Sequence, residues 1–345
     1  MPPHINHAGQ LARGLISLMA VVLAVAGCSS HRIDAAPPTI VPAQAAVSPP
    51  VSGTPAGVVR PLSGHPQAAV FDAATATLVV LSANAGDQAV VTILAPAGIP
   101  RTVPLAGAAT AMAGDASGHV FVSTRGGYYR VDAAAATATR VDIDGQQATD
   151  FTAIAHRADG RLVLGSSDGT VYTLSSDTAV GARLKIFARV DALVTQGNTA
   201  VVLDRGQTSV TSVDASGANA EHALRAGEGA TTLAADSAGR VLVADTRGEE
   251  LLVFGTDPLI LRQRYPVRES PYGLTGSSGL AWVSQTAANT VVGYDLATGI
   301  PVEKVRYPTV QQPNSLAFDD ASGTLYVVSG SAAGVQVIAG AGVRR

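Results

Sequence analysis

The feature of this chain that most constrains its fold is a repeat of about forty residues that starts near residue 57. Two copies align without a gap over residues 69–82 and 316–329. Equivalent positions in seven units are Ala69, Met112, Ile154, Leu193, Leu233, Leu274 and Leu316. Subtraction gives spacings of 43, 42, 39, 40, 41 and 42 residues. Self-similarity at such a period is typical of solenoids and propellers.

The interior of each unit predicts strands rather than helices. A short apolar run is followed by a turn rich in Gly, Asp, Asn or Ser, then by a Val- and Leu-rich run. Alternating stretches such as 170–174 and 290–294 come next, and this period of two indicates half-buried strands. Four antiparallel strands in about forty residues make one propeller blade. The sequence therefore predicts an all-β fold, a seven-bladed β-propeller over residues 57–345.

The two ends of the repeat region predict how the ring closes. The last unit stops after three strands, at residues 334–338, while a spare extended segment, 58–62, precedes the first unit. We expect this N-terminal segment to pair as the outer strand of the last blade, which removes exposed sheet edges. The alternative is a ring of six blades with a stray hairpin.

The N-terminus reads as a processing signal. An apolar run from Gly14 to Ala26 is long enough for the core of a signal peptide but short for a membrane span. It ends in the sequence Val25-Ala26-Gly27-Cys28, which resembles a bacterial lipobox, and Cys28 is the single cysteine of the chain. We therefore predict a lipoprotein signal peptide over residues 1–27 and lipidation of Cys28. An ordinary secretory signal with an incidental cysteine is the alternative.

Residues 28–56 separate this signal from the repeats. They are rich in Pro, Ala and Ser, carry almost no charge and show no periodicity. Such a composition does not bury enough surface to offset the entropy of ordering the chain. We predict a disordered tether that holds the propeller away from a membrane.

Residues 280–305 resemble a YVTN-type propeller repeat, and other units resemble NHL repeats more weakly. With the lipobox and the tether, the whole chain is also similar to a mycobacterial family of envelope lipoproteins. The first resemblance implies a fold and no activity. The second implies an envelope lipoprotein to which no reaction is assigned.

The charge of the chain argues against nucleic-acid binding. Its formal net charge is −3, and it contains no long basic run. Proteins that bind nucleic acid carry a concentrated stripe of Lys and Arg. We therefore expect no nucleic-acid partner.

The mouth of the central channel is the place where we expect a ligand. The column two residues before each anchor should line it, because the innermost strands surround the axis. From this column and its surroundings, the candidate ligand-binding residues are Gln67, Asp150, Thr152, Asp191, Tyr272 and Asn314. A polar lining that merely solvates the channel is the alternative.

Propeller lactonases of the regucalcin and gluconolactonase type hold a divalent metal at this mouth with carboxylate and Asn oxygens. The column contains one carboxylate, Asp191, and one asparagine, Asn314, and His65 and Asp150 lie further out. We therefore assign no metal ligands and expect no cofactor, and a divalent metal at the channel mouth stays the alternative.

Three arginines occupy one equivalent position in their units. Arg125, Arg205 and Arg247 each follow the second strand, on the face where the inner strands begin. A guanidinium group binds carboxylate and phosphate groups well, so the three are candidates for an anion-binding rim. Ion pairs with Asp204 and Asp245 are the simpler interpretation for two of them.

Nothing in the sequence demands a catalytic site. We predict a secreted propeller, lipid-anchored to the outer face of the cytoplasmic membrane, that acts as a non-catalytic binding or scaffolding module. Its partners would be the membrane, through Cys28, and an envelope protein, glycan or lipid. The alternative function is a metal-dependent lactonase or hydrolase at the channel mouth.

Overall fold

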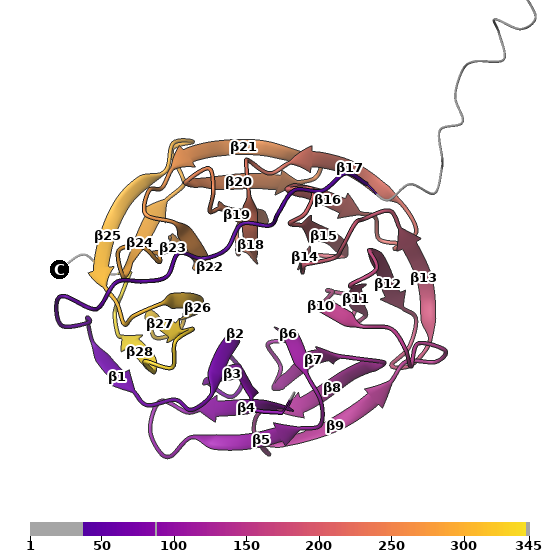
Figure 1. The fold of residues 1–345 in the computed structure, drawn as a ribbon, viewed down its shortest axis with the longest axis horizontal. Helices are drawn as coiled ribbons and strands as arrows, with labels where there is room; N and C mark the ends of the chain where they lie inside the picture. The colour runs from indigo at the N-terminus through magenta and orange to yellow at the C-terminus, as the bar shows by residue number, and fades with distance from the viewer. Residues whose placement is uncertain (1–36, 87, 343–345) are drawn as a thin grey trace, which may run out of the picture. The chain divides into compact units, whose positions relative to one another are not determined.

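The computed structural model describes residues 37–86 and 88–342. Twenty-eight strands in this part of the chain form seven sheets of four strands each, and the described residues contain no helix. No helix capable of crossing a membrane is therefore found among residues 37–86 and 88–342. The sheets surround a central axis as the blades of a propeller (Figure 1), which confirms the predicted fold class and the number of blades.

Each blade is an antiparallel meander that runs from the axis to the rim. Blade 1 contains β2 (His65–Asp72), β3 (Thr77–Asn84), β4 (Gln88–Leu94) and β5 (Arg101–Leu105). Blade 2 contains β6 (Ala109–Gly114), β7 (His119–Thr124), β8 (Gly127–Asp132) and β9 (Thr137–Asp142). Blade 3 contains β10 (Phe151–His156), β11 (Leu162–Ser166), β12 (Thr170–Leu174) and β13 (Val180–Lys185).

The next three blades have the same plan. Blade 4 contains β14 (Ala192–Gln196), β15 (Thr199–Asp204), β16 (Ser209–Val213) and β17 (Ala220–Arg225). Blade 5 contains β18 (Ala230–Ala235), β19 (Arg240–Asp245), β20 (Glu250–Thr256) and β21 (Leu259–Pro266). Blade 6 contains β22 (Pro271–Gly276), β23 (Ala281–Gln285), β24 (Thr290–Asp295) and β25 (Val302–Pro308).

Blade 7 closes the ring with strands from both ends of the repeat region. It contains β26 (Pro313–Asp319), β27 (Thr324–Ser329), β28 (Val335–Ile338) and the N-terminal strand β1 (Val58–Arg60). Strand β1 pairs antiparallel with β28, with Val58 opposite Val337 and Arg60 opposite Val335. The predicted closure is confirmed, and the six-bladed alternative is wrong.

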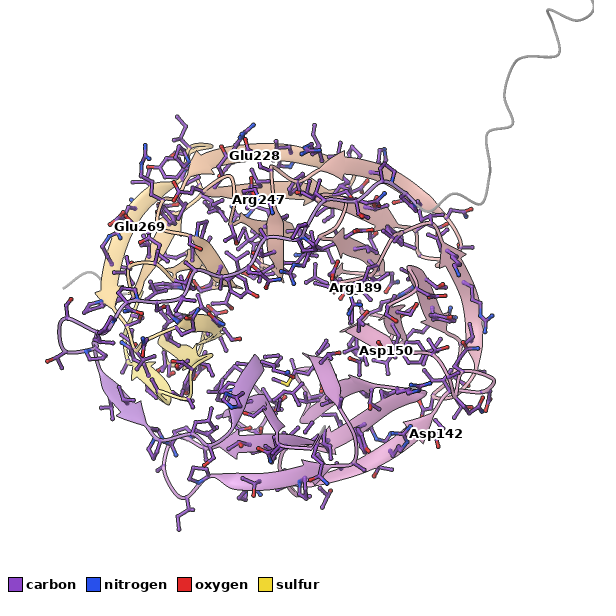
Figure 2. The ribbon with its side chains drawn as sticks, in the orientation of Figure 1. Asp142, Asp150, Arg189, Glu228, Arg247 and Glu269 are labelled. Atoms are coloured by element: carbon purple, nitrogen blue, oxygen red, sulfur yellow. The ribbon has the colours of Figure 1, made fainter. Side chains whose placement is uncertain are left out.

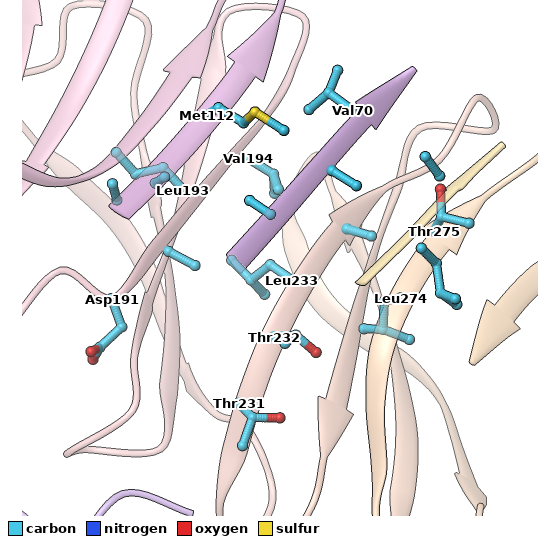
Figure 3. Close-up of a pocket in the computed structure, with 18 of the residues that line it drawn as sticks. Val70, Met112, Asp191, Leu193, Val194, Thr231, Thr232, Leu233, Leu274 and Thr275 are labelled. Carbon is cyan, nitrogen blue, oxygen red and sulfur yellow. The ribbon is translucent and has the colours of Figure 1, made fainter. Parts of the chain in front are cut away.

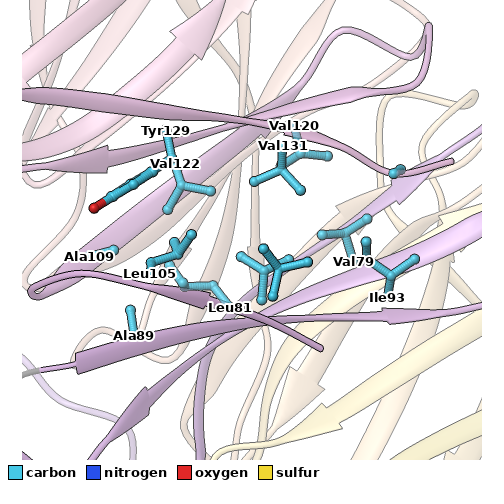
Figure 4. Packing of buried hydrophobic residues seen from close by; sticks show 13 residues of the cluster. Val79, Leu81, Ala89, Ile93, Leu105, Ala109, Val120, Val122, Tyr129 and Val131 are labelled. Atoms are coloured by element: carbon cyan, nitrogen blue, oxygen red, sulfur yellow. The ribbon is translucent and has the colours of Figure 1, made fainter. Parts of the chain in front are cut away.

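The hydrophobic core lies between neighbouring blades. Valines and leucines that alternate along β3 and β4 pack on those of β7 and β8 (Figure 4), and most of them are fully buried. Trp282 of blade 6 is fully buried and stacks on Phe318 of blade 7 at a ring distance of 5.7 Å. Burying each such side chain contributes about 1.5–3 kcal/mol. Every blade is therefore stabilised by both of its neighbours, which makes the ring a rigid support for its loops.

The connections between strands alternate between two faces because consecutive strands are antiparallel. The inner strands begin on one face, which we call the mouth face, and this face also holds the turns between the second and third strands. The turns between the first and second strands, and between the third and fourth, lie on the opposite face. The predicted channel-mouth and arginine residues belong to the mouth face.

The segment before the propeller differs from its prediction as a disordered tether. Residues 37–56 contain no strand, yet they run as an extended segment across the mouth face of blades 4–6 (Figure 1). We call these twenty residues the strap. They carry no charge and form no strand ladder, so their backbone groups are available to the propeller loops. The predicted signal peptide, Cys28 and the first part of the predicted tether lie outside the described residues.

Candidate functional site

A channel with a volume of about 500 Å³ opens along the axis of the propeller (Figure 3). All seven inner strands contribute to its wall, mainly with small and aliphatic side chains such as Ala69, Ala153 and Val194. Each inner strand is also the last strand of its sheet, so one backbone edge has no ladder partner. The wall therefore offers backbone N–H and C=O groups together with its side chains.

Polar side chains gather where the inner strands begin. Thr110, Asp191, Arg205, Thr231 and Tyr272 line the channel at its mouth. In Figure 3, Asp191 and Thr231 lie toward one end, while Val70 and Met112 lie toward the other. The channel thus has a polar mouth and a more apolar interior.

Asp191 is the acidic residue of this wall. Its side chain is 11% exposed, and its carboxylate accepts hydrogen bonds from the Arg205 backbone N–H at 2.8 Å and from Arg189 Nε at 3.1 Å. Burial raises the pKa of the Asp191 carboxyl above its ordinary value of 3.8, although the Arg205 N–H and the Arg189 charge lower it. The site therefore holds a carboxylate that is largely withdrawn from water and close to two arginines.

The structure brings only part of the predicted channel set together. Asp191 and Tyr272 line the channel, whereas the other four predicted residues do not. The Thr152 hydroxyl is buried and donates to the Val190 carbonyl. Asn314 accepts a hydrogen bond from Gln312 at 3.0 Å. Gln67 and Asp150 are exposed on the mouth face outside the channel wall.

A β-bulge lies at the predicted column in most blades. The pairing of inner and second strands shifts register at the start of the inner strand in six blades, between Pro66 and Ala68 in blade 1, for example. At such a bulge, the side chain of the extra residue points in a direction that regular alternation along the strand does not predict. Gln67, Thr152 and Asn314 each occupy the shifted position. Thr110, Thr231 and Tyr272 occupy the same shifted position and do line the channel, so the bulge alone does not decide which side chains face it.

Two residues of the wall were not selected from the sequence. Thr110 and Thr231 belong to the same column as Asp191, but no sequence feature distinguishes them from the other hydroxyl residues of that column. The Thr231 hydroxyl shares a hydrogen bond of 2.6 Å with Thr246. The repeated occurrence of threonine in that column is the sequence signal that could have identified these two wall residues.

The predicted arginine rim is divided by the strap. Arg205 donates to the Ala43 carbonyl, and Arg247 Nη2 donates to the Val41 carbonyl at 2.6 Å. Arg125 is exposed on blade 2, where no strap residue lies. Figure 2 places Arg247 over blade 5, with Arg189 and Asp150 beside the central opening. Two of the three predicted anion-binding groups are thus engaged by strap carbonyls.

Ser48 holds the centre of the strap. Its hydroxyl donates to the Thr286 carbonyl at 2.6 Å and accepts from the Gln312 N–H at 3.0 Å. The Gln312 side chain accepts from the Ser48 N–H at 3.0 Å and donates to the Ala46 carbonyl at 2.9 Å. Asn289 adds a hydrogen bond to the Pro49 carbonyl at 2.8 Å. The propeller therefore recognises mainly the strap backbone.

The strap also needs small residues where it approaches the loops. Ala43 is buried, and a Cβ atom built on Gly229 would lie 2.9 Å from the Ala43 Cβ. The Ile40 N–H donates to the Gly206 carbonyl at 2.7 Å. A glycine at position 229 therefore leaves the room in which the strap lies.

The candidate metal ligands do not form a cluster. No group of three or more His, Cys, Asp or Glu side chains arranged to hold a metal ion is found among the described residues. Of the two candidates of the predicted column, Asp191 lines the channel and Asn314 does not.

Comparison with known proteins supports the fold. Neither a family model nor a curated protein matches the sequence. Among solved structures, a streptogramin B lyase superposes with a TM-score of 0.67 at 10% identity, covering 82% of this chain and 96% of that chain. The WD40 propeller domain of Doa1 gives 0.63 at 13% identity, covering 81% and 96%. A virginiamycin B lyase from Staphylococcus aureus gives 0.64 at 11% identity, covering 79% and 94%. At such identities these similarities show the propeller fold alone.

Proposed function

We propose that this chain is a lipid-anchored, non-catalytic binding propeller of the cell envelope, and that its channel mouth binds a hydroxyl-rich ligand such as a glycan. The observation that carries the proposal is the polar channel mouth around Asp191. Thr110 and Thr231 line the channel there together with a carboxylate and with the free backbone edges of the inner strands.

The chemistry of this wall suits a sugar better than a simple anion. A sugar hydroxyl both donates and accepts hydrogen bonds, so it can pair with the N–H and the C=O groups of an open strand edge. A fully ionised phosphate only accepts hydrogen bonds, and the guanidinium group that lines the channel, Arg205, already binds the strap. The volume of about 500 Å³ lies within the range of small-molecule sites.

The proposed location rests on the N-terminal sequence. The apolar run 14–26 and the small residues before Cys28 support secretion and lipidation on the outer face of the cytoplasmic membrane. A propeller held at that surface meets envelope glycans, lipids and proteins as partners. The net charge of −3 supports the proposal that nucleic acid is not among them.

A metal-dependent lactonase or hydrolase is the competing function. It would require oxygen ligands around a cation at the channel mouth. Asp191 is the carboxylate at that wall, and two solved lyases share the fold at 10% and 11% identity. We propose no cofactor, and the experiment below decides between the two functions.

Calorimetric titration with two matched disaccharides tests the proposal. Chitobiose carries ammonium groups that diacetylchitobiose lacks, and the buried carboxylate of Asp191 should favour the charged sugar. We expect chitobiose to bind at least tenfold more tightly, and Asp191→Asn to remove this preference, because a hydrogen bond between charged groups contributes about 1.5–3 kcal/mol.

Asp150→Asn is the matched control, because Asp150 is exposed outside the channel wall. It should leave both affinities unchanged. Absence of sugar binding, together with stoichiometric Ca²⁺ or Zn²⁺ that Asp191→Asn removes, would replace the proposal with the lactonase alternative.

A further inference from the structure

We infer that the mouth face rests against a lipid bilayer and that the strap fixes this orientation. The contact presupposes the lipid anchor proposed above. It goes beyond that anchor, because a lipid on a freely moving tether would leave every face of the propeller equally accessible. The partner we assign to this surface is the lipid bilayer itself.

The place where the strap begins limits how the propeller is held. Pro38 shares a surface depression with Phe187 and Leu224 at the outer edge of blade 4, and the next contact is from Ile40 to Gly206 on the mouth face. Nine peptide units separate Cys28 from Pro37. Covalent geometry limits them to about 30 Å. The described part of the chain therefore starts at the edge of the mouth face, and no more than nine peptide units separate it from the proposed anchor.

The outward surface of the strap suits a bilayer interface. Val41 is 82% exposed and Val47 is 91% exposed, while Ile40 and Val51 are also exposed. No charged residue occurs in the whole strap. Its carbonyls at Val41 and Ala43 are bound by arginines, so part of the backbone is already satisfied before it leaves water. Apolar side chains on a neutral, hydrogen-bonded segment enter a membrane interface at low cost.

Within residues 37–86 and 88–342, the opposite face is not covered by an uncharged segment of this kind. Its strand connections contain Asp115, Asp159, Asp177, Asp214, Asp236, Asp257 and Asp320, against two arginines, Arg157 and Arg161. Two exposed isoleucines, Ile99 and Ile300, lie apart from each other in blades 1 and 6. The mouth-face connections also carry exposed carboxylates, among them Asp150, Glu228 and Glu269. The apolar exposure of the strap therefore selects the mouth face.

The orientation of the mouth face determines which molecules reach the channel first. A channel mouth turned toward the bilayer meets the head groups of membrane lipids before it meets soluble molecules. The hydroxyl-rich ligand proposed above would then be presented by a glycosylated lipid.

Fluorescence quenching on vesicles tests the orientation. The lipidated full chain is placed on vesicles of phosphatidylethanolamine and phosphatidylglycerol that contain brominated lipid as quencher. One fluorophore is attached at Glu228→Cys on the mouth face, and another at Ser237→Cys on the opposite face of the same blade. We expect at least threefold stronger quenching at position 228.

A pair of double variants sharpens the result. Val41→Asp with Val47→Asp should abolish the difference between the two probes while the protein still floats with the vesicles. Ile99→Asp with Ile300→Asp, the matched pair on the opposite face, should leave the difference intact. Equal quenching of the two probes in the unmodified protein, with flotation retained, would overturn the orientation and leave the anchor standing. A chain that does not float would overturn the proposed anchor and the orientation with it.

Discussion

The mouth face has two sectors that share one strand plan and differ in what covers them. Blades 4–7 form the covered sector, where the strap contacts the loops, and blades 1–3 form the open sector (Figure 1). Arg125 of the open sector and Arg205 of the covered sector occupy equivalent positions in their blades. Arg125 is exposed, whereas Arg205 binds a strap carbonyl. Equivalence in a repeat therefore fixes position in the ring but not the interaction that a residue makes.

The last residue of each second strand shows the same contrast in more detail. In blade 5, the fully buried Asp245 accepts hydrogen bonds from the N–H groups of Glu228, Gly229 and Gly248, at 2.8, 2.7 and 3.0 Å. In blade 2, Thr124 at the equivalent position donates one hydrogen bond to the Ala108 carbonyl at 2.7 Å. Asp245 and Thr124 each link the end of their second strand to the connection that precedes their blade. The carboxylate orders the loops against which the strap lies.

The largest expected difference between the sectors comes from removing these two side chains. Asp245→Ala leaves three backbone N–H groups without their acceptor, and we expect a loss of about 3–4 kcal/mol in the free energy of unfolding. Thr124→Ala removes one hydrogen bond, and we expect about 1 kcal/mol. Urea unfolding followed by circular dichroism measures both. Equal losses would show that the loops of the two sectors are held alike.

A smaller and local effect is expected when the strap is released. Gln312→Ala removes the acceptor of the Ser48 N–H and the donor to the Ala46 carbonyl. We expect hydrogen exchange at Ser48 to become roughly tenfold faster, because a pair of such bonds contributes about 1–2 kcal/mol. Global stability should change little.

The control for this variant lies in the open sector. Gln147 is exposed in the connection between blades 2 and 3, so Gln147→Ala should leave exchange in the strap unchanged. Unaltered protection of Ser48 in the Gln312→Ala protein would mean that other contacts hold the strap.

The smallest expected effect is a difference between the pKa values of two carboxyl groups, one in each sector. At Asp168 of blade 3, burial opposes ionisation, but hydrogen bonds from Ser166 and Lys185 prevail and lower the carboxyl pKa to about 2. At Asp191, which leads into blade 4, burial raises the pKa above 3.8. Carboxyl carbon NMR as a function of pH measures both values.

The two shifts have opposite consequences for stability. The lowered pKa of Asp168 gives a contribution that is present above the unfolded value near 3.9 and is lost as the pH falls toward 2. The raised pKa of Asp191 gives a stability contribution that is lost as the pH rises through the pKa of the folded state. Titration of Asp191 below 3.8 would contradict the burial that distinguishes its site.

Part of the candidate site followed from the sequence. Asp191 and Tyr272 were predicted to line the channel, and both do, because the starts of the inner strands converge on the axis. Gln67, Thr152 and Asn314 do not, although a β-bulge lies at these three positions and at Tyr272 alike. A bulge depends on how two strands pair, and alternation within one strand does not reveal it.

The sequence by itself determined the number of blades, their order and the closing strand. Each blade is specified by a local pattern of apolar residues and turns, and that pattern recurs at an almost constant spacing. Only the tertiary structure decided the course of the strap and the fate of the arginines. The partners of Ser48 and Ala43 lie more than 160 positions away in the chain. An uncharged Pro- and Ala-rich segment is compatible with a free tether or a bound one, because what binds it is the three-dimensional arrangement of distant loops rather than its own composition.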